Sequence, residues 1–174
     1  NIHAHYDLGN RFYSRWLDPS MTYSSAVFRS PDEDLTTAQM NKYAQLADMI
    51  DLKPGMHVLE IGCGWGGFAE YAARERGARV TGVTISKEQH AWAVERLARA
   101  GLSDRTEILL KDYRDITGQF DAVASIEMFE AVGEEYWPAY FDKVSSVLKP
   151  GGKAGLQIIT IDDRLFDEYR SRAD

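Results

Sequence analysis

The sequence predicts a doubly wound α/β domain built on a mostly parallel sheet, and two observations carry this prediction. From residue 56 onward, short apolar runs alternate with segments whose apolar residues recur at helical spacing. The apolar run VLEI at residues 58–61 also passes directly into the turn GCGWGG at residues 62–67. Glycine in such a turn permits positive φ and lets a ligand approach the main chain closely. We therefore expect a ligand at the carboxyl ends of the strands.

The elements follow from periodicity and from turn residues. Expected strands are apolar and bounded by turns, and they cover residues 56–61, 79–83, 106–110, 122–126 and 153–159. Expected helices cover residues 35–51, 67–76, 86–100 and 134–147. Ser86 and Gln89 have the spacing of a capping box, which predicts where the third of these helices begins. Pro-Gly pairs at residues 54–55 and 150–151 predict the turns before the first and last strands.

The chain divides into two parts by texture. Residues 1–52 are dense in aromatic and turn-forming residues, and we expect them to form a helical cover over the active site. Residues 53–174 form the ligand-binding α/β core. Both ends look cut, so we expect the core to be truncated and its last strands to be missing.

Composition excludes several classes of protein. The net charge of -7 argues against a nucleic-acid partner, which usually meets a basic surface. One cysteine, Cys63, excludes a disulfide framework and fits a cytoplasmic protein. No apolar run is long enough for a membrane-spanning helix. The four histidines have no metal-ligand spacing, so no metal site is expected.

The turn at residues 62–67 predicts a nucleoside ligand, and its neighbours indicate which one. Gly62, Gly64 and Gly66 follow a G-x-G-x-G pattern rather than the G-x-G-x-x-G of dinucleotide sites. No acid follows the second strand to bind ribose hydroxyls, and no Gly-Lys-Ser/Thr marks a P-loop. Glu60, just before the glycines, suits a cationic ligand. These features favour S-adenosylmethionine, whose sulfonium and ammonium groups are positive.

Six motifs spaced along the chain indicate the protein family more specifically. They are HYDLGN (residues 5–10), LDP (17–19), MTYSSA (21–26), GCGWG (62–66), GVTIS (82–86) and MFEAVG (128–133). Together they closely resemble the cyclopropane fatty acid synthase and mycolic acid cyclopropane synthase family, which are class I methyltransferases that use S-adenosylmethionine. The resemblance runs over nearly the whole chain.

The resemblance implies transfer of a methylene or methyl group from S-adenosylmethionine to the cis double bond of an unsaturated phospholipid acyl chain. It also implies the residues that hold the cofactor. At the methionine end these are Tyr23, Ser24, Gly62, Cys63, Gly64 and Gly66, with Glu60 beside them. The residues at the ribose are Thr84, Ile85, Ser86 and Gln89. Asp112 and Tyr113 are placed near the adenine, and Ile126 lines the same site.

The chemistry requires a group that removes a proton after the alkene has been alkylated. Glu130, in an otherwise apolar stretch after the fourth strand, is our candidate for the base or for the group that holds it, with Glu127 as its rival. Aromatic faces stabilise a cation by roughly 0.5–2 kcal/mol, and Trp65 and Phe129 are the candidates at strand ends.

Cyclopropane-forming members of the family hold a bicarbonate ion as base. The resemblance matches Glu130 and Ile159 to two of its contacts, but Ser25 stands at the position of a Cys and Gln157 at that of a His. A further Tyr contact would lie beyond residue 174. Ser25 and Gln157 can still hydrogen-bond an anion but carry no positive charge. The departures could instead mark a branch whose product is a methylene-branched chain.

Other functions stay open at this point. The same cradle would serve a methyltransferase for a soluble small molecule, or a domain that binds the cofactor without catalysis. The family resemblance implies a bacterial, cytoplasmic protein, and a lipid substrate implies peripheral contact with the inner membrane face. The product, the acyl length and the oligomeric state are not determined by the sequence.

Overall fold

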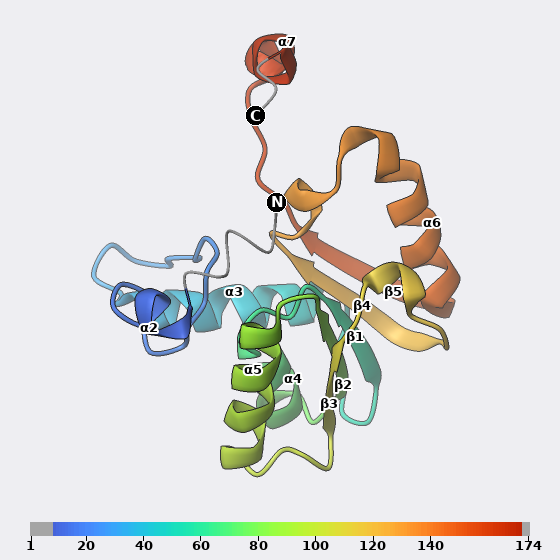
Figure 1. Ribbon diagram of the computed structural model, residues 1–174. Helices are drawn as coiled ribbons and strands as arrows, with labels where there is room; N and C mark the ends of the chain where they lie inside the picture. The colour runs from blue at the N-terminus through green and yellow to red at the C-terminus, as the bar shows by residue number, and fades with distance from the viewer. Residues whose placement is uncertain (1–8, 172–174) are drawn as a thin grey trace.

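A computed structural model describes residues 9–171 (Figure 1). Its centre is a parallel five-stranded sheet in the order β3-β2-β1-β4-β5. The strands are β1 His57–Ile61, β2 Arg79–Thr84, β3 Thr106–Leu110, β4 Phe120–Ile126 and β5 Leu148–Gln157. The predicted fold class is confirmed, and β1 lies between β2 and β4, where the order of the strands reverses.

Helices cover both faces of the sheet. On one face lie α3 Leu35–Met49, α4 Gly67–Glu75 and α5 Lys87–Arg99, and on the other lies α6 Trp137–Val147. Val58 of β1 packs toward the first group, and its neighbours Leu59 and Ile61 belong to the cluster around α6. A parallel sheet buried on both faces requires such continuous apolar strands. The shorter helices α2 Asn10–Tyr13 and α7 Asp163–Ser171 lie at the two ends of the described chain, and α7 extends away from the sheet (Figure 1).

Several boundaries differ from the predicted ones by a few residues. The predicted helix 134–147 is divided into a 3-10 turn, η3 Glu134–Tyr136, and α6, whose first turn contains Pro138. The predicted strand 153–159 begins earlier, at Leu148, and ends at Gln157. Its pairing with β4 is interrupted by a register shift that accommodates the Pro-Gly turn. The predicted cap of α5 is present, since Ser86 Oγ accepts a hydrogen bond from Gln89 N at 3.3 Å.

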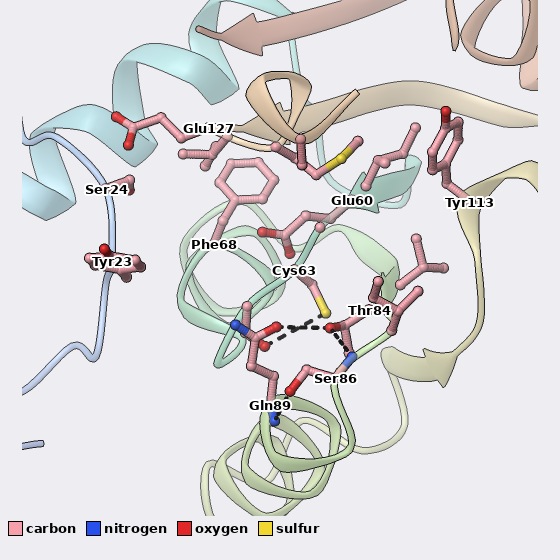
Figure 2. Close-up of a pocket in the computed structure, with 18 of the residues that line it drawn as sticks. Tyr23, Ser24, Glu60, Cys63, Phe68, Thr84, Ser86, Gln89, Tyr113 and Glu127 are labelled. Carbon is pink, nitrogen blue, oxygen red and sulfur yellow. Dashed lines mark hydrogen bonds between the residues drawn. The ribbon is translucent and has the colours of Figure 1, made fainter. Parts of the chain in front are cut away.

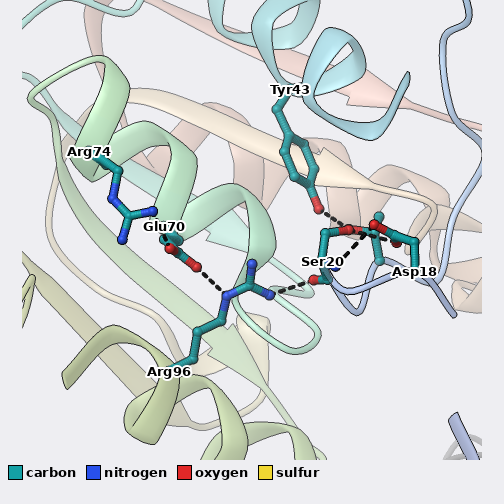
Figure 3. Close-up of polar contacts among 7 residues, drawn as sticks. Asp18, Ser20, Tyr43, Glu70, Arg74 and Arg96 are labelled. Atoms are coloured by element: carbon teal, nitrogen blue, oxygen red, sulfur yellow. Dashed lines mark hydrogen bonds and ion pairs between the residues drawn. The ribbon is translucent and has the colours of Figure 1, made fainter. Parts of the chain in front are cut away.

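The N-terminal segment is bound to the α/β core by a chain of buried hydroxyl groups. Ser20 Oγ donates to Asp18 Oδ1 at 2.8 Å and lies 2.7 Å from Thr22 Oγ1. Thr22 Oγ1 lies 2.6 Å from the hydroxyl of Tyr43 on α3, a helix whose apolar side is part of the sheet's core (Figure 3). Residues before α3 therefore pack on a helix that itself belongs to the α/β core.

A second link joins the segment to α4 and α5. The Arg96 guanidinium on α5 contacts the Glu70 carboxylate on α4 and donates to the main-chain oxygen of Ser20 (Figure 3). Arg74 contacts the other oxygen of Glu70 at 2.6 Å. These contacts fix the loop that leads to Tyr23 and Ser24. Within residues 9–171, no helix is both long and apolar enough to cross a membrane.

Candidate active site

A cavity of about 900 Å³ opens at the carboxyl ends of β1, β2 and β4. Its walls come from these strand ends, from the start of α5 and from the segment before α3. Figure 2 shows Tyr113 on one side of the cavity, Tyr23, Ser24 and Glu127 on the opposite side, and Glu60 between them. The fold therefore places the ligand site where a doubly wound sheet is expected to bind its ligand.

The three glycines of the turn after β1 have different structural roles. Gly62, Gly64 and Gly66 all have positive φ, at 80°, 52° and 82°. A Cβ at Gly62 would lie 2.6 Å from Met128 Cγ, so a larger residue does not fit there. Gly66 is the N-cap of α4, where an added Cβ would lie 3.1 Å from that of Ala93. Gly62 and Gly64 line the cavity, whereas Gly66 allows α4 and α5 to approach each other.

Glu60 lies at the centre of the cavity and is almost completely buried. Its Oε2 makes no hydrogen bond to any residue that the structure describes. Burial raises the pKa of Glu60 well above its usual value, although Arg96 and Lys42 oppose this shift. An unpartnered buried carboxylate oxygen costs free energy unless a ligand satisfies it. A positively charged or hydrogen-bond-donating ligand group would do so.

Past β2, the polar residues form a connected and buried network. Thr84 Oγ1 donates to Gln89 Oε1 at 2.8 Å and accepts from Ser86 N at 3.1 Å (Figure 2). All three line the cavity together with Ile85. Because they are held by one another, their positions are set before a ligand arrives.

The far side of the cavity is formed by the segment after β3. Asp112 and Tyr113 both line it. The Arg114 guanidinium contacts Asp112 at 2.7 Å and lowers the pKa of that carboxyl. The Tyr113 ring packs against Tyr140 at 5.4 Å. Asp112 is therefore an oriented carboxylate, and Tyr113 an anchored aromatic wall.

The near side depends on two residues that sequence reasoning missed. The buried Lys42 on α3 donates from Nζ to Ser24 Oγ. Gln39, one turn earlier, donates from Nε2 to Ser24 O at 2.8 Å. A lysine four residues from both Ala38 and Leu46 on the apolar side of a helix was the available signal. Lys42 and Gln39 fix Ser24 where it lines the cavity.

The catalytic candidates lie at the ends of β4 and β5. Glu130 lines the cavity, and its carboxylate accepts a hydrogen bond from Ile159 N. Ser25 and Gln157 stand just outside the lining, where both donate to Glu127 Oε1, at 2.8 Å from Ser25 N and 2.7 Å from Gln157 Nε2. Glu127, the predicted rival of Glu130, is thus the carboxylate that Ser25 and Gln157 contact.

The structure brings most of the predicted cofactor residues to one cavity. Thirteen of the fourteen line it, namely Tyr23, Ser24, Glu60, Gly62, Cys63, Gly64, Thr84, Ile85, Ser86, Gln89, Asp112, Tyr113 and Ile126. Gly66 is the exception. Burial raises the pKa of the Cys63 thiol well above its usual value, which leaves it unreactive.

Of the two aromatic candidates, only Trp65 lines the cavity, and Phe129 does not. Phe129 instead packs among Trp137, Tyr140 and Phe141, because the 3-10 turn after β4 directs its ring toward α6. Residues 5–8 of the HYDLGN motif lie outside the described residues, whereas its last residue, Asn10, accepts a hydrogen bond from Trp65 Nε1 at 2.6 Å. Within residues 9–171, no cluster of acidic, His and Cys side chains could hold a metal ion.

The chain matches the family described as mycolic acid cyclopropane synthetase over residues 1–172. The chain belongs to this family. The resemblance that the sequence motifs carried is therefore confirmed.

Several curated relatives are similar to this chain over most of its length. It is 45% identical over 168 residues to tuberculostearic acid methyltransferase UfaA1 of Mycobacterium tuberculosis, covering 92% of the chain and 39% of that relative. It is 48% identical over 148 residues to cyclopropane-fatty-acyl-phospholipid synthase of Escherichia coli K12, covering 85% and 37%. The chain thus spans less than two fifths of the length of these curated relatives.

A solved member of the family has the same fold. The structure superposes on mycolic acid cyclopropane synthase CmaA1, solved with SAH and CTAB, with a TM-score of 0.87 and 31% identity. The match covers 99% of this chain and 60% of that chain.

Proposed function

We propose that the protein transfers a methylene or methyl group from S-adenosylmethionine to the cis double bond of an unsaturated fatty acyl chain of a phospholipid. The observation that carries the proposal is the unpartnered Glu60 oxygen inside a cavity whose other walls are glycine main chain and fixed hydroxyl groups. Its relatives include a cyclopropane-fatty-acyl-phospholipid synthase.

The described residues fit this cofactor. Glu60 offers a carboxylate to an ammonium group, and Gly64, where an added Cβ would meet no atom within 4 Å, leaves room for a ligand against the main chain. Thr84, Ser86 and Gln89 would hold the ribose, and Tyr113 would cover the adenine. When bound, S-adenosylmethionine supplies a methyl group carried on a positively charged sulfur. The methionine end would then point toward Tyr23 and Ser24.

The acyl chain must reach that same end and be held there without water. An alkene is a weak nucleophile, so positioning supplies much of the catalysis, on the order of 7–11 kcal/mol. Tyr23 and Trp65 line the cavity, and their aromatic rings would stabilise the cation that forms on the acyl chain. A phospholipid substrate requires peripheral contact with a membrane, and we place the protein at the inner face of the cytoplasmic membrane.

Glu130, Ser25 and Gln157 form the proposed catalytic group. Glu130 lines the cavity three residues after Glu127, and Ser25 and Gln157 meet at the carboxylate of Glu127. The reaction needs one base to remove a proton, and these residues offer two candidates for it. One is a bicarbonate ion held by Glu130, Ser25 and Gln157, and the other is a carboxylate of the chain itself.

The name of one relative favours a different product of the same reaction, a branched acyl chain. The chain is 45% identical to a tuberculostearic acid methyltransferase, whose named product is a fatty acid rather than a cyclopropane phospholipid. The Ser and Gln at positions 25 and 157 agree with such a branch, in which the cation shifts a hydride and ends as a methylene-branched chain.

The function is tested on the intact protein with S-adenosylmethionine and unsaturated phospholipid vesicles. We expect acyl chains that have gained one CH2 by mass spectrometry, and chromatography then separates a ring from a branched alkene of equal mass. Unchanged acyl chains, together with heat of cofactor binding in a calorimeter, would contradict the proposal and favour a domain that binds without catalysis. Methylation of a soluble amine or hydroxyl compound instead would identify a small-molecule methyltransferase.

A further inference from the structure

The donors expected to hold an external anion already contact carboxylates of the chain. Ser25 N and Gln157 Nε2 both donate to Glu127 Oε1. Ile159 N donates to Glu130. These are the positions that the family resemblance assigns to bicarbonate contacts. An incoming bicarbonate ion would have to displace a carboxylate from Ser25 N, Gln157 Nε2 and Ile159 N.

The side-chain amide of Gln157 has no N–H left for another acceptor. Its second amide hydrogen points at the main-chain oxygen of Ser25, at 3.3 Å. Its own main-chain oxygen accepts from Glu127 N at 2.9 Å. Gln157 therefore holds Glu127 by both main chain and side chain, and Ser25 closes the arrangement from the other side.

The backbone of Glu127 is strained in a way that directs its side chain. Its φ is +45°, in the left-handed region that few non-glycine residues adopt. Such strain is retained where the surrounding structure imposes it, and it concentrates at functional sites. The side chain is half-buried and lines the cavity beside Ser24 (Figure 2). Its Oε2 makes no hydrogen bond to residues 9–171, so one carboxylate oxygen is held and the other is available.

A buried cation lies behind this carboxylate. Lys42 contacts Ser24, the residue before Ser25, and its charge is attracted by that of Glu127. By contrast, Glu130 is exposed, and its carboxylate is bound to the chain after β5. Of the two carboxylates, Glu127 is the more buried and the better oriented.

We propose that Glu127 is the base of the reaction and that the enzyme needs no bicarbonate. This inference rests on the proposed function. Once the transferred carbon has bonded to the alkene carbon and S-adenosylhomocysteine has left, Glu127 Oε2 takes one proton from that transferred carbon. The electron pair of the broken C–H bond closes the ring or, after a 1,2-hydride shift, forms the double bond of a methylene branch. Protonated Glu127 then releases the proton to water, and Glu130 holds the neighbouring chain.

Two variants of the intact protein separate the base from a structural role. Glu127→Gln keeps an oxygen that accepts from Ser25 and Gln157, whereas Glu127→Gly suits the positive φ and leaves a space. We expect both to keep cofactor affinity by calorimetry and to lose at least about tenfold in turnover. In CO2-free buffer, added formate, acetate or bicarbonate should raise the turnover of Glu127→Gly at least about threefold. The same additions should not raise the turnover of Glu127→Gln. Glu75→Gln, an exposed change at the end of α4, should match wild type.

Wild-type turnover should be the same with and without bicarbonate. A wild-type enzyme that stops in CO2-free buffer and recovers with bicarbonate would overturn the inference, as would a fully active Glu127→Gln. In both cases the acyl chains still gain CH2, so the proposed function stands. If wild type adds no CH2 to any acyl chain, the proposed function itself fails, and the base role with it.

Discussion

At the scale of single residues, the most unusual group in the described chain is Lys42. It lies on the buried side of α3, 2% exposed, over the ring of Tyr43 and against Ser24. Burial lowers its pKa from 10.5 to about 8, although Glu127, Asp18 and Glu60 oppose the shift. The buried ammonium donates to Ser24 Oγ and so fixes Ser24 at the cavity.

This pKa makes stability depend on pH in a defined direction. Below about pH 8, Lys42 is charged in both folded and unfolded protein, and the folded state bears the cost of burying it. Between about pH 8 and 10.5 only the unfolded state still binds the proton, so stability rises with pH. Lys42→Met has no such proton. We expect its stability relative to wild type to fall by up to about 3 kcal/mol across this window.

Urea denaturation at a series of pH values measures this difference. Lys53→Met is the matched control, because Lys53 is exposed and pairs only with Asp51 at the surface. Its stability relative to wild type should not change with pH. A constant difference between Lys42→Met and wild type would show that Lys42 is charged in the folded protein throughout the window.

At the scale of elements, the wall formed by residues 18–25 is held in place by α3, α4 and α5. Arg96 on α5 joins Glu70 on α4 to the main chain of Ser20 in a mostly buried contact. Arg99, one turn later on the same helix, pairs with Glu95 in solvent. The two arginines therefore allow a matched comparison of a mostly buried and an exposed ion pair on the same helix.

We expect Arg96→Ala to lower the free energy of unfolding by about 1–3 kcal/mol, since it leaves the Ser20 carbonyl and one oxygen of the partly buried Glu70 carboxylate without this partner, while Arg74 still contacts the other oxygen. Amide exchange in residues 18–25 should become faster and cofactor affinity weaker. Arg99→Ala should change stability by less than about 0.5 kcal/mol, as exposed pairs contribute little. Hydrogen exchange and urea denaturation measure both variants. Equal effects of the two changes would mean that the wall is held without Arg96.

At the scale of the whole molecule, the cavity joins the strand ends to the segment before α3, so a ligand in it contacts both. Binding to the folded state alone stabilises it by mass action, about 2.7 kcal/mol at one hundred times the dissociation constant. We expect S-adenosylmethionine to raise the melting temperature. ATP, which shares adenosine but presents phosphates to Glu60, should not. No shift at millimolar S-adenosylmethionine would contradict the proposed cofactor.

Much of the site was predictable because its residues follow local rules. The glycines after β1 and the hydroxyl groups after β2 lie within a few residues of strand ends, and a parallel sheet brings those ends to one edge. Phe129 was placed wrongly because the direction of a ring in a 3-10 turn depends on what packs nearby, and here that is α6. Lys42 was missed because the burial of a lysine depends on the segment that covers it.

The sequence by itself determined the fold class, the nucleoside cradle and the family, since each is encoded by periodicity or by contiguous motifs. Only the tertiary structure decided which carboxylate meets Ser25 and Gln157. Ser25 is 102 residues from Glu127, and Gln157 is 30 residues beyond it. No local pattern relates these positions. They meet because β4 pairs with β5 and because the N-terminal segment folds back across the ends of both strands.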